Sequence, residues 1–339
     1  MAQFTAINLN AAEMSSSVVY AVQGGQCGGY ARLASFIPPV LWSSPSPLSW
    51  QALSVAPLGG DVFGMSEQQQ VGDLGGHASM WTGGAPSRVD LNPTGANASE
   101  AHATTGAYQA GFARFGTDTY PRAGIWHGTA QSWVNLNPAG AIGSYAWAAA
   151  ADRQGGQVVF PGLPGQGSLF YAALWNRTAE SFVNMSPGPN FGSSILGMSG
   201  DQQVGWVESS TMAMHASLCT GTAASWVDLH PHSDGMSVFY GTCGTAQVGY
   251  VSSSITGIPH AGIWFGTAQS FIDLGSLLPP GYGESVAYAV DEQNGVFTVG
   301  GYADHNGHFE AFIWVGVPSP STAATLVFAG VLAVRRGRR

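Results

Sequence analysis

One phrase recurs along this chain, and its spacing constrains the fold more than any other feature of the sequence. The clearest copies are AGIWHGTAQSWVNLNP from Ala123, AALWNRTAESFVNMSP from Ala172, ASLCTGTAASWVDLHP from Ala216 and AGIWFGTAQSFIDLGS from Ala261. The anchor positions, 39 to 50 residues apart, are Trp42, Trp81, Trp126, Trp175, Cys219, Trp264 and Trp314. A period of about 40 to 50 residues with aromatic, glycine and turn signals is typical of propeller blades or a related array.

Each period divides into four short runs of 4 to 7 residues. A Gly-Thr-Ala turn after the anchor leads to a run such as residues 132–136 (SWVNL), and then to a small-residue run such as 285–290 (SVAYAV). A third run, such as 202–207 (QQVGWV), precedes the run that ends at the next anchor. The runs are β-branched and aromatic and are bounded by Gly, Pro, Asn and Ser, which indicates strands. No stretch within the repeats sustains helical periodicity, so the sequence predicts an all-β chain.

The two ends of the repeat array are complementary halves. Residues 4–10 (FTAINLN) match the run after an anchor, and residues 311–316 (AFIWVG) match an anchor run without its partner. The intervening units cover residues 4–42, 50–81, 88–126, 133–175, 182–219, 226–264 and 271–314. Pairing of the first and last strands would close a ring and remove its open edges. We therefore predict a seven-bladed propeller of four-stranded blades; six blades, eight blades and an open β-solenoid are the alternatives.

Closure also predicts the order of strands within a blade. The opening strand would be the outermost strand of the last blade, which puts the small-residue run nearest the axis. That run is rich in Gly, Ala and Ser, as in residues 61–66, 101–106, 146–151 and 195–200. Large side chains would then fill the spaces between blades, where each contributes about 1.5–3 kcal/mol when buried.

The charge of the chain excludes one class of partner. Charged residues make up 9% of the chain, against roughly 25% in typical domains, and Lys is absent. Four of the ten Arg lie in the last five positions, so residues 1–334 carry 6 Arg against 19 Asp plus Glu, a formal balance of −13. Nucleic-acid binding needs clustered Lys or Arg, so we do not expect this protein to bind nucleic acid.

The C-terminal 23 residues differ from the repeats, and we divide the chain into a propeller (residues 1–316) and a tail (317–339). The tail has a Pro-Ser-Pro motif, a 13-residue apolar run (322–334) and an Arg cluster. As a helix the run would reach about 20 Å, short of the roughly 30 Å hydrocarbon core. An interfacial or sorting segment with transient membrane contact is therefore favoured. The N-terminal residues show no signal peptide.

Both parts resemble known families. The phrase W-x-G-T-A-x-S-[FW]-[VI]-[DN]-L-x-P, with its Gln-Val-Gly and His-Ala-x-x-Trp runs, resembles the bacterial extracellular HAF repeats. The tail resembles a PEP-CTERM sorting signal, with Ser where that family usually has Glu; its residues are Pro318, Ser319, Pro320, Arg335, Arg336, Arg338 and Arg339. This resemblance implies export, processing by an exosortase-type enzyme, and release to the cell surface or extracellular matrix.

Candidates for metal binding or catalysis all have simpler structural interpretations. His77, His215 and His260 recur four residues before an anchor, where a repeated residue is most simply structural. Asp90, Asp228 and Asp273, in register with Asn135 and Asn184, fit turn formation, and the pairs Gln69–Gln70 and Gln202–Gln203 fit exposed turns. The clusters Asp304-His305-Asn306-Gly307-His308 and His230-Pro231-His232 with Asp234 could hold a metal or form plain turns. Cys219 fits buried packing; a Cys219–Cys243 disulfide is the alternative. We assign no metal, cofactor or catalytic residue.

The loops before the anchor runs vary most, and ligand sites tend to lie on variable loops. Phe36, Tyr120, Phe170 and Tyr171 on these loops could stack against sugars. We therefore predict a non-enzymatic exported protein whose propeller associates with polysaccharide or serves adhesion. A glycan-active lyase or hydrolase on the same scaffold, and a subunit that organises other proteins, are the alternatives.

Overall fold

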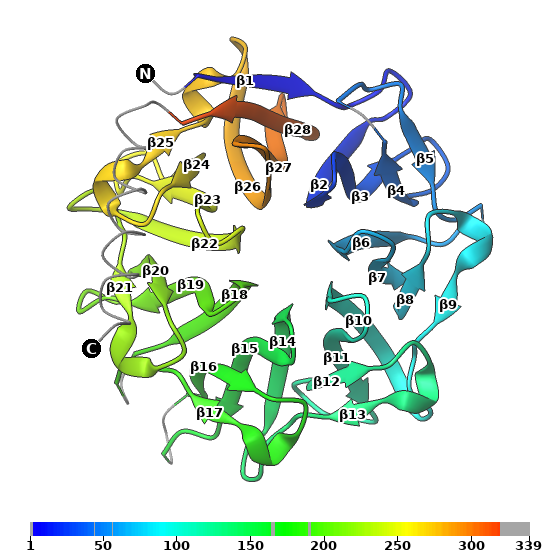
Figure 1. Ribbon diagram of the computed structural model, residues 1–339, viewed down its shortest axis with the longest axis vertical. Helices are drawn as coiled ribbons and strands as arrows, with labels where there is room; N and C mark the ends of the chain where they lie inside the picture. The colour runs from blue at the N-terminus through cyan, green and yellow to red at the C-terminus, as the bar shows by residue number, and fades with distance from the viewer. Residues whose placement is uncertain (1–2, 44, 56, 164–166, 189–190, 319–339) are drawn as a thin grey trace.

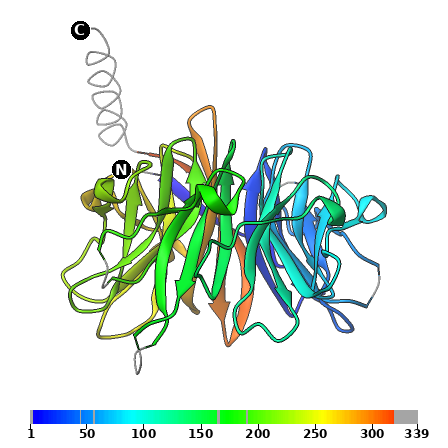
Figure 2. The same cartoon turned by 90° about the horizontal axis from the view of Figure 1, so that it is seen from below.

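The computed structural model describes residues 3–43, 45–55, 57–163, 167–188 and 191–318, and these residues form a seven-bladed β-propeller. Seven four-stranded antiparallel sheets stand around a central channel (Figure 1), and their strands run along the channel axis (Figure 2). The predicted fold class and blade number are confirmed.

Each blade uses its strands in chain order from the channel outwards. The inner strands are β2 (Ser16–Gln23), β6 (Gly60–Met65), β10 (Ala96–Thr104), β14 (Gly143–Ala150), β18 (Ser193–Ser199), β22 (Met236–Thr242) and β26 (Tyr282–Gln293). The second strands are β3 (Gln26–Arg32), β7 (Gln70–Leu74), β11 (Gln109–Phe115), β15 (Arg153–Phe160), β19 (Gln202–Glu208), β23 (Gln247–Ser252) and β27 (Val296–His305). The third strands are β4 (Pro39–Trp42), β8 (His77–Trp81), β12 (Arg122–Trp126), β16 (Leu169–Trp175), β20 (Met214–Cys219), β24 (Pro259–Trp264) and β28 (His308–Val317).

The outer strands are β5 (Trp50–Ala52), β9 (Val89–Asp90), β13 (Val134–Asn135), β17 (Val183–Asn184), β21 (Val227–Asp228), β25 (Ile272–Asp273) and β1 (Gln3–Asn8). Most are shorter than the predicted runs of about five residues, because the Gly-Thr-Ala turn continues into one turn of 3-10 helix. These turns are η1 (Ala85–Ser87), η2 (Ala130–Ser132), η3 (Ala179–Ser181), η4 (Ala223–Ser225) and η5 (Ala268–Ser270); η6 (Gly275–Leu277) follows β25. In η2 the Ser132 hydroxyl accepts from the amide of His127 and donates to the carbonyl of Thr129, which holds the turn.

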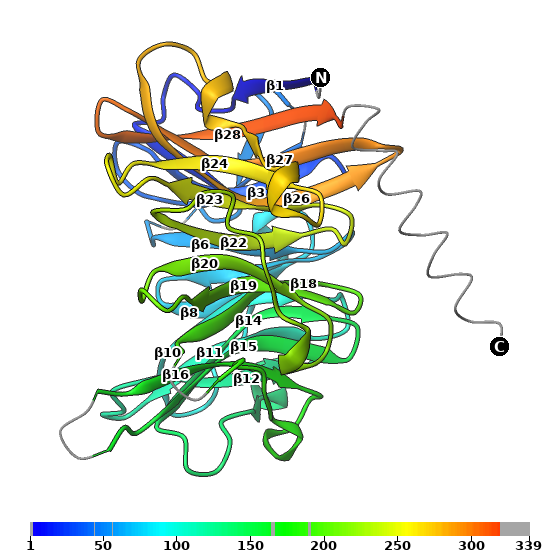
Figure 3. The same ribbon diagram turned by 90° about the vertical axis from the view of Figure 1, so that its left-hand side faces the viewer.

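The N-terminal strand closes the ring. β1 pairs antiparallel with β28 from Gln3↔Val317 to Asn8↔Phe312, so the last blade combines β26, β27 and β28 with β1. Figures 1 and 3 show β1 beside β28. The predicted pairing of the chain's first and last strands is confirmed.

The anchor tryptophans form the core between blades. Six of them are at most 1% exposed, and the indole of Trp42 donates a hydrogen bond to the carbonyl of Leu9. In the fifth blade the buried Cys219 replaces the anchor, and Trp226 packs against the hydrophobic cluster that contains it. The Trp226 indole donates to the carbonyl of Met185, which stands at the position of Leu9 in its repeat. Trp226 therefore takes over part of the missing anchor's role, and all three cysteines are free thiols.

Buried serines connect neighbouring blades. Ser144 on β14 accepts a hydrogen bond at 2.9 Å from the amide of Ala123 on β12 and donates to Asn137. The same serine bond is made by Ser17, Ser99, Ser193, Ser237 and Ser285. An unpaired buried amide would cost about 1–3 kcal/mol, so these hydroxyls explain why serine recurs in the inner strands.

The glutamine pairs are not exposed turn residues, and that prediction is wrong. Gln70 is 2% exposed and accepts a hydrogen bond from the amide of Gly83, while Gln203 does the same for Gly221. Gln69 accepts from the side chain of Gln109 in the next blade. Gln69, Gln70 and Gln203 are buried and Gln202 is half-buried, because each satisfies a turn amide or bridges two blades.

The tail lies almost wholly outside the described residues. Of the predicted sorting residues only Pro318 is described, and the apolar run and the Arg cluster fall within residues 319–339. In the described part of the chain no helix is long and apolar enough to cross a membrane. Export and tail processing stay predictions.

Candidate channel site

Every inner strand contains a β-bulge that directs a large side chain into the central channel. At this bulge the register with the second strand skips one residue in each blade; β10 and β26 each have a second irregularity nearer their N-terminal ends. The seven skipped residues, which we call the channel ring, are Tyr20, Phe63, His102, Trp147, Leu196, Tyr240 and Tyr288. They line a cavity of about 370 Å³ at the centre of the propeller. A bulge commonly re-aims a side chain in this way.

Close packing of the inner strands explains why the large residues point into the channel. The residue after each ring member is Ala or Gly. A Cβ on Gly64 would lie 2.5 Å from the carbonyl oxygen of His102, and one on Gly241 would lie 2.6 Å from that of Tyr288. Only small residues fit where neighbouring inner strands meet, so the bulky neighbour is turned towards the axis.

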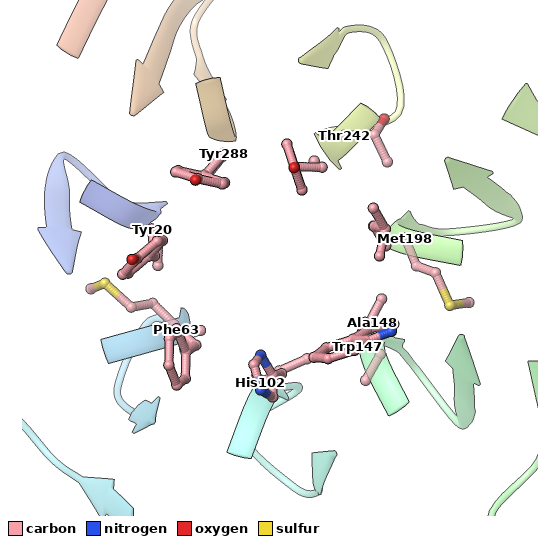
Figure 4. A pocket seen from close by; sticks show the side chains of 18 of the residues that line it. Tyr20, Phe63, His102, Trp147, Ala148, Met198, Thr242 and Tyr288 are labelled. Atoms are coloured by element: carbon pink, nitrogen blue, oxygen red, sulfur yellow. The ribbon is translucent and has the colours of Figure 1, made fainter. Parts of the chain in front are cut away.

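Six ring members contact one another in an unbroken arc, and Leu196 is the seventh. The contacts, as distances between ring centroids, are Tyr240–Tyr288 (4.9 Å), Tyr288–Tyr20 (5.0 Å), Tyr20–Phe63 (5.5 Å), Phe63–His102 (4.5 Å) and His102–Trp147 (4.7 Å). Figure 4 shows the labelled members on successive inner strands around the channel. Burial raises the pKa of the Tyr240 hydroxyl to about 12. The pKa values of Tyr20 and Tyr288 are also raised, mainly by burial, so the ring tyrosines are neutral at physiological pH.

Three carboxylates lie beside the ring, towards the N-terminal ends of the inner strands. Asp61 on β6 and Asp73 on β7 are direct partners in the ladder, and Glu100 lies on β10 of the next blade. The imidazole of His102 donates from Nε2 to Glu100 at 2.9 Å, which links this carboxylate cluster to the ring. Burial, and then repulsion between the carboxylates, raises the pKa of Asp61 to about 7 and that of Asp73 to about 6.

The raised pKa of Asp61 predicts a pH-dependent stability. Its folded pKa of about 7 lies above the unfolded value of about 3.9, so the folded state binds the proton more tightly. Stability from this group is present below about pH 4 and is lost as pH rises towards 7. We expect Asp61→Asn to raise the free energy of unfolding by about 2 kcal/mol at pH 8 and by less at pH 5.

Urea unfolding of both proteins at pH 5 and pH 8 measures this difference. Asp201→Asn is the matched control, because the Asp201 side chain is 91% exposed and its replacement should leave the pH dependence unchanged. Parallel pH profiles for the wild type and Asp61→Asn would contradict the assignment.

The repeated histidines are structural. The Nδ1 atoms of His77, His215 and His260 donate to Asp90, Asp228 and Asp273 of the neighbouring outer strands, at 3.0, 2.7 and 3.2 Å. The other oxygen of each aspartate accepts a backbone amide two or three residues later, as predicted for turn residues. Asn135 and Asn184 accept the equivalent amide bond in their blades.

One serine–histidine pair has the residue types of a catalytic nucleophile and its base, but its serine is not accessible to a substrate. The Oγ of Ser237 lies 2.7 Å from Nδ1 of His230, and Nε2 of His230 lies 3.1 Å from the carbonyl of Asp234. Ser237 is fully buried, and its oxygen also accepts the amide of Ala216. Burial lowers the pKa of His230. His230 accepts from its serine as Asn137 does from Ser144, so this pair joins two blades.

The first cluster of possible metal ligands in the sequence forms a turn. Residues 304–308 form the hairpin between β27 and β28, with His305 opposite His308. Asn306 and Gly307 have φ of 56° and 82°, as a two-residue hairpin turn requires. His305 donates to Glu310. Within the described ranges no group of three or more His, Cys, Asp or Glu side chains is placed to hold a metal.

The four predicted ligand-binding residues do not come together at one site. Phe36 and Tyr120 lie on loops, whereas Phe170 and Tyr171 belong to strand β16, so their assignment to a loop is wrong. Tyr120 packs edge-on against Phe170 at 6.1 Å, and Tyr171 packs against Phe160. The ring cavity is lined by other residues. The sequence did carry a signal for the ring, since each small-residue run has one large residue followed by Ala or Gly.

No protein-family model matches this chain, and no curated protein matches it. Solved structures share its fold. A puromycin hydrolase aligns with a TM-score of 0.62 at 11% identity, over 94% of this chain and 56% of its own. A puromycin-hydrolyzing peptidase from Mycobacterium tuberculosis aligns with a TM-score of 0.56 at 11% identity, over 91% and 55%. The propeller domain of the Trilobed protease from Pyrococcus furiosus, described as having an open velcro topology, aligns with a TM-score of 0.57 at 8% identity, over 89% and 94%.

These matches correct two expectations drawn from the sequence. We predicted a non-enzymatic scaffold for polysaccharide or adhesion, with a glycan-active enzyme as the alternative, whereas these solved structures of the same fold are a puromycin hydrolase, a puromycin-hydrolyzing peptidase and the propeller domain of a protease. The expectation of a protein without enzymatic activity is wrong on the same finding. The present chain spans slightly more than half the length of the two puromycin-hydrolysing proteins. At these identities the likeness shows the fold.

Proposed function

We propose that this protein takes part in peptide hydrolysis and that its propeller admits peptides and holds them in the central channel. The observation that carries the proposal is the channel ring, in which seven inner strands each present one side chain to a cavity of about 370 Å³. Ligand sites are typically concave and mostly apolar with a few polar groups. The presence of this fold in peptidases supports peptides as the ligand.

The dimensions and chemistry of the ring suit a short unfolded peptide. Aromatic faces pack against aliphatic and aromatic side chains of any sequence, and the ring tyrosines supply hydroxyl groups for the peptide backbone. The buried Ser237–His230 pair does not act as the hydrolytic centre in this proposal. That centre belongs to a unit outside the described propeller, in this polypeptide or in a second one.

Binding of a neutral peptide tests this proposal. Isothermal titration of the full chain with acetyl-Ala-Ala-Phe-Ala-Ala-amide should show saturable binding. Trp147→Leu should weaken it roughly tenfold, the equivalent of one aromatic contact of about 1.4 kcal/mol. Leu163→Ala is the matched control, because Leu163 is 69% exposed and does not line the ring cavity. Equal affinity in Trp147→Leu, or no binding by the wild type, would refute peptide binding in the channel.

Hydrolysis is read in the same samples as release of free amine from the peptide. Release by the purified chain places the hydrolytic centre in this polypeptide, and binding without release places it in a partner.

A further inference from the structure

Acidic side chains lie on one side of the channel ring. The carboxylate cluster of Asp61, Asp73 and Glu100 lies beside it in the second and third blades. Glu284 on β26 of the seventh blade lies on the same side of the ring and accepts a hydrogen bond from Tyr302. Acidic groups from these blades therefore flank the arc that contains Tyr288, Tyr20, Phe63 and His102.

These negative charges are only partly compensated by the protein. Arg88 acts on Asp73, but its guanidinium is bonded to Ser79 and pairs with Asp90 on the outer strand β9. His102 bonds one oxygen of Glu100. Burial, and then repulsion from Asp73 and Glu100, raises the pKa of the half-buried Asp61, and burial, and then repulsion from Glu100, raises that of Asp73. A positive charge between these carboxylates and the ring would relieve that repulsion.

The aromatic side chains of the channel ring also favour a positively charged ligand. The face of an aromatic ring carries negative electrostatic potential and attracts ammonium and guanidinium groups within about 6 Å of its centroid. Phe63 and His102 stack with an interplanar angle of 11°, and Trp147 meets His102 edge-on. Glu100 is hydrogen-bonded to His102 of the ring, and the charge of Asp61 acts on Tyr20 of the ring. Carboxylates therefore neighbour the aromatic arc, and an anionic ligand would meet repulsion there.

We propose that the channel ring is a binding site for a protonated amine, which a peptide presents on a lysine side chain. The ammonium lies against the aromatic arc and faces Asp61, Asp73 and Glu100, while the alkyl chain contacts the apolar ring members. The peptide part of this inference rests on the proposed function; the amine part rests on the ring and the carboxylate cluster.

Two peptides, one with a charged lysine side chain and one with that amine acetylated and neutral, test the proposal. Acetyl-Ala-Ala-Lys-Ala-Ala-amide and the same peptide with Nε-acetyl-lysine are titrated into the full chain at pH 8 in low salt. We expect the lysine peptide to bind roughly tenfold more tightly. Asp61→Asn and Glu100→Gln should each reduce the ratio to threefold or less, whereas Asp201→Asn, at an exposed carboxylate, should preserve it. Circular dichroism checks that each variant is folded.

The outcomes separate this inference from the proposed function. Equal affinity for the two peptides overturns the amine site and leaves peptide binding in the channel intact. If neither peptide binds, butylammonium is titrated alone: binding that Asp61→Asn weakens supports the amine site and overturns the peptide proposal. Failure of butylammonium as well overturns both.

Discussion

Removal of residues 1–10 is expected to abolish cooperative folding of the propeller. The deletion takes away β1, which forms a six-residue ladder with β28, and the buried Leu9, whose carbonyl accepts from the Trp42 indole. It also removes Asn8, whose side chain donates to Tyr282 and Glu310 of the last blade. Backbone hydrogen bonds at about 0.5–1.5 kcal/mol each and two buried apolar side chains at about 1.5–3 kcal/mol each sum to roughly 5–10 kcal/mol. That is comparable to the total stability of many domains.

Thermal unfolding followed by circular dichroism measures the effect, and size-exclusion chromatography detects association through the exposed edge of β28. The control restores the strand from the other end, with residues 3–10 joined after Pro318 through a short turn and the chain started at residue 11. Because Gln3 pairs with Val317, this permutant places the same strand in the same ladder. It should unfold close to the wild-type temperature. A deletion variant as stable as the wild type would show that β1 does not close the ring.

Trp264→Ala is expected to lower the free energy of unfolding by about 3–5 kcal/mol. Trp264 is fully buried between blades and packs against Phe239 and Phe271, with ring centroids at 4.7 and 4.8 Å. Neighbouring strands are fixed by their ladders and cannot collapse into the space, so the truncation leaves a cavity.

Trp147→Ala is the matched control, since it removes the same side chain from the channel, where Trp147 is only partly buried. Its stability loss should be about 1 kcal/mol, measured by urea unfolding alongside Trp264→Ala. Equal losses in the two variants would contradict the assignment of Trp264 to the core and Trp147 to the ligand cavity.

The blade number, the strand order and the ring closure followed from the sequence because each depends on a local pattern. Every blade repeats the same four runs, and the ends at Phe4 and Trp314 belong to complementary halves of one repeat. Because the period occurs seven times, it remains recognisable despite a local exception such as Cys219. The turn roles of the repeated aspartates followed for the same reason, since their amide partners are two or three residues away.

The sequence contains the pattern that marks the inner strands, but we interpreted it only as crowding near the axis. A bulky residue before Ala or Gly recurs in every small-residue run, and this pattern marks the channel ring. Whether that residue points into the channel depends on a bulge, and the bulge depends on how closely the next blade's inner strand approaches, as Gly64 and His102 show.

Only the tertiary structure decided which residues share an environment across blades. Asp61 and Glu100 are 39 residues apart in sequence and become electrostatic neighbours because successive inner strands meet around the axis. The burial of Gln69 likewise depends on Gln109, 40 residues further along the chain. The repeat determines the contacts within each blade, because they join residues that are close in sequence. Some contacts across blades repeat, such as the serine bond of Ser144, whereas Asp61 and Glu100 are side chains that do not recur. No local pattern records which non-repeating side chains ring closure brings together.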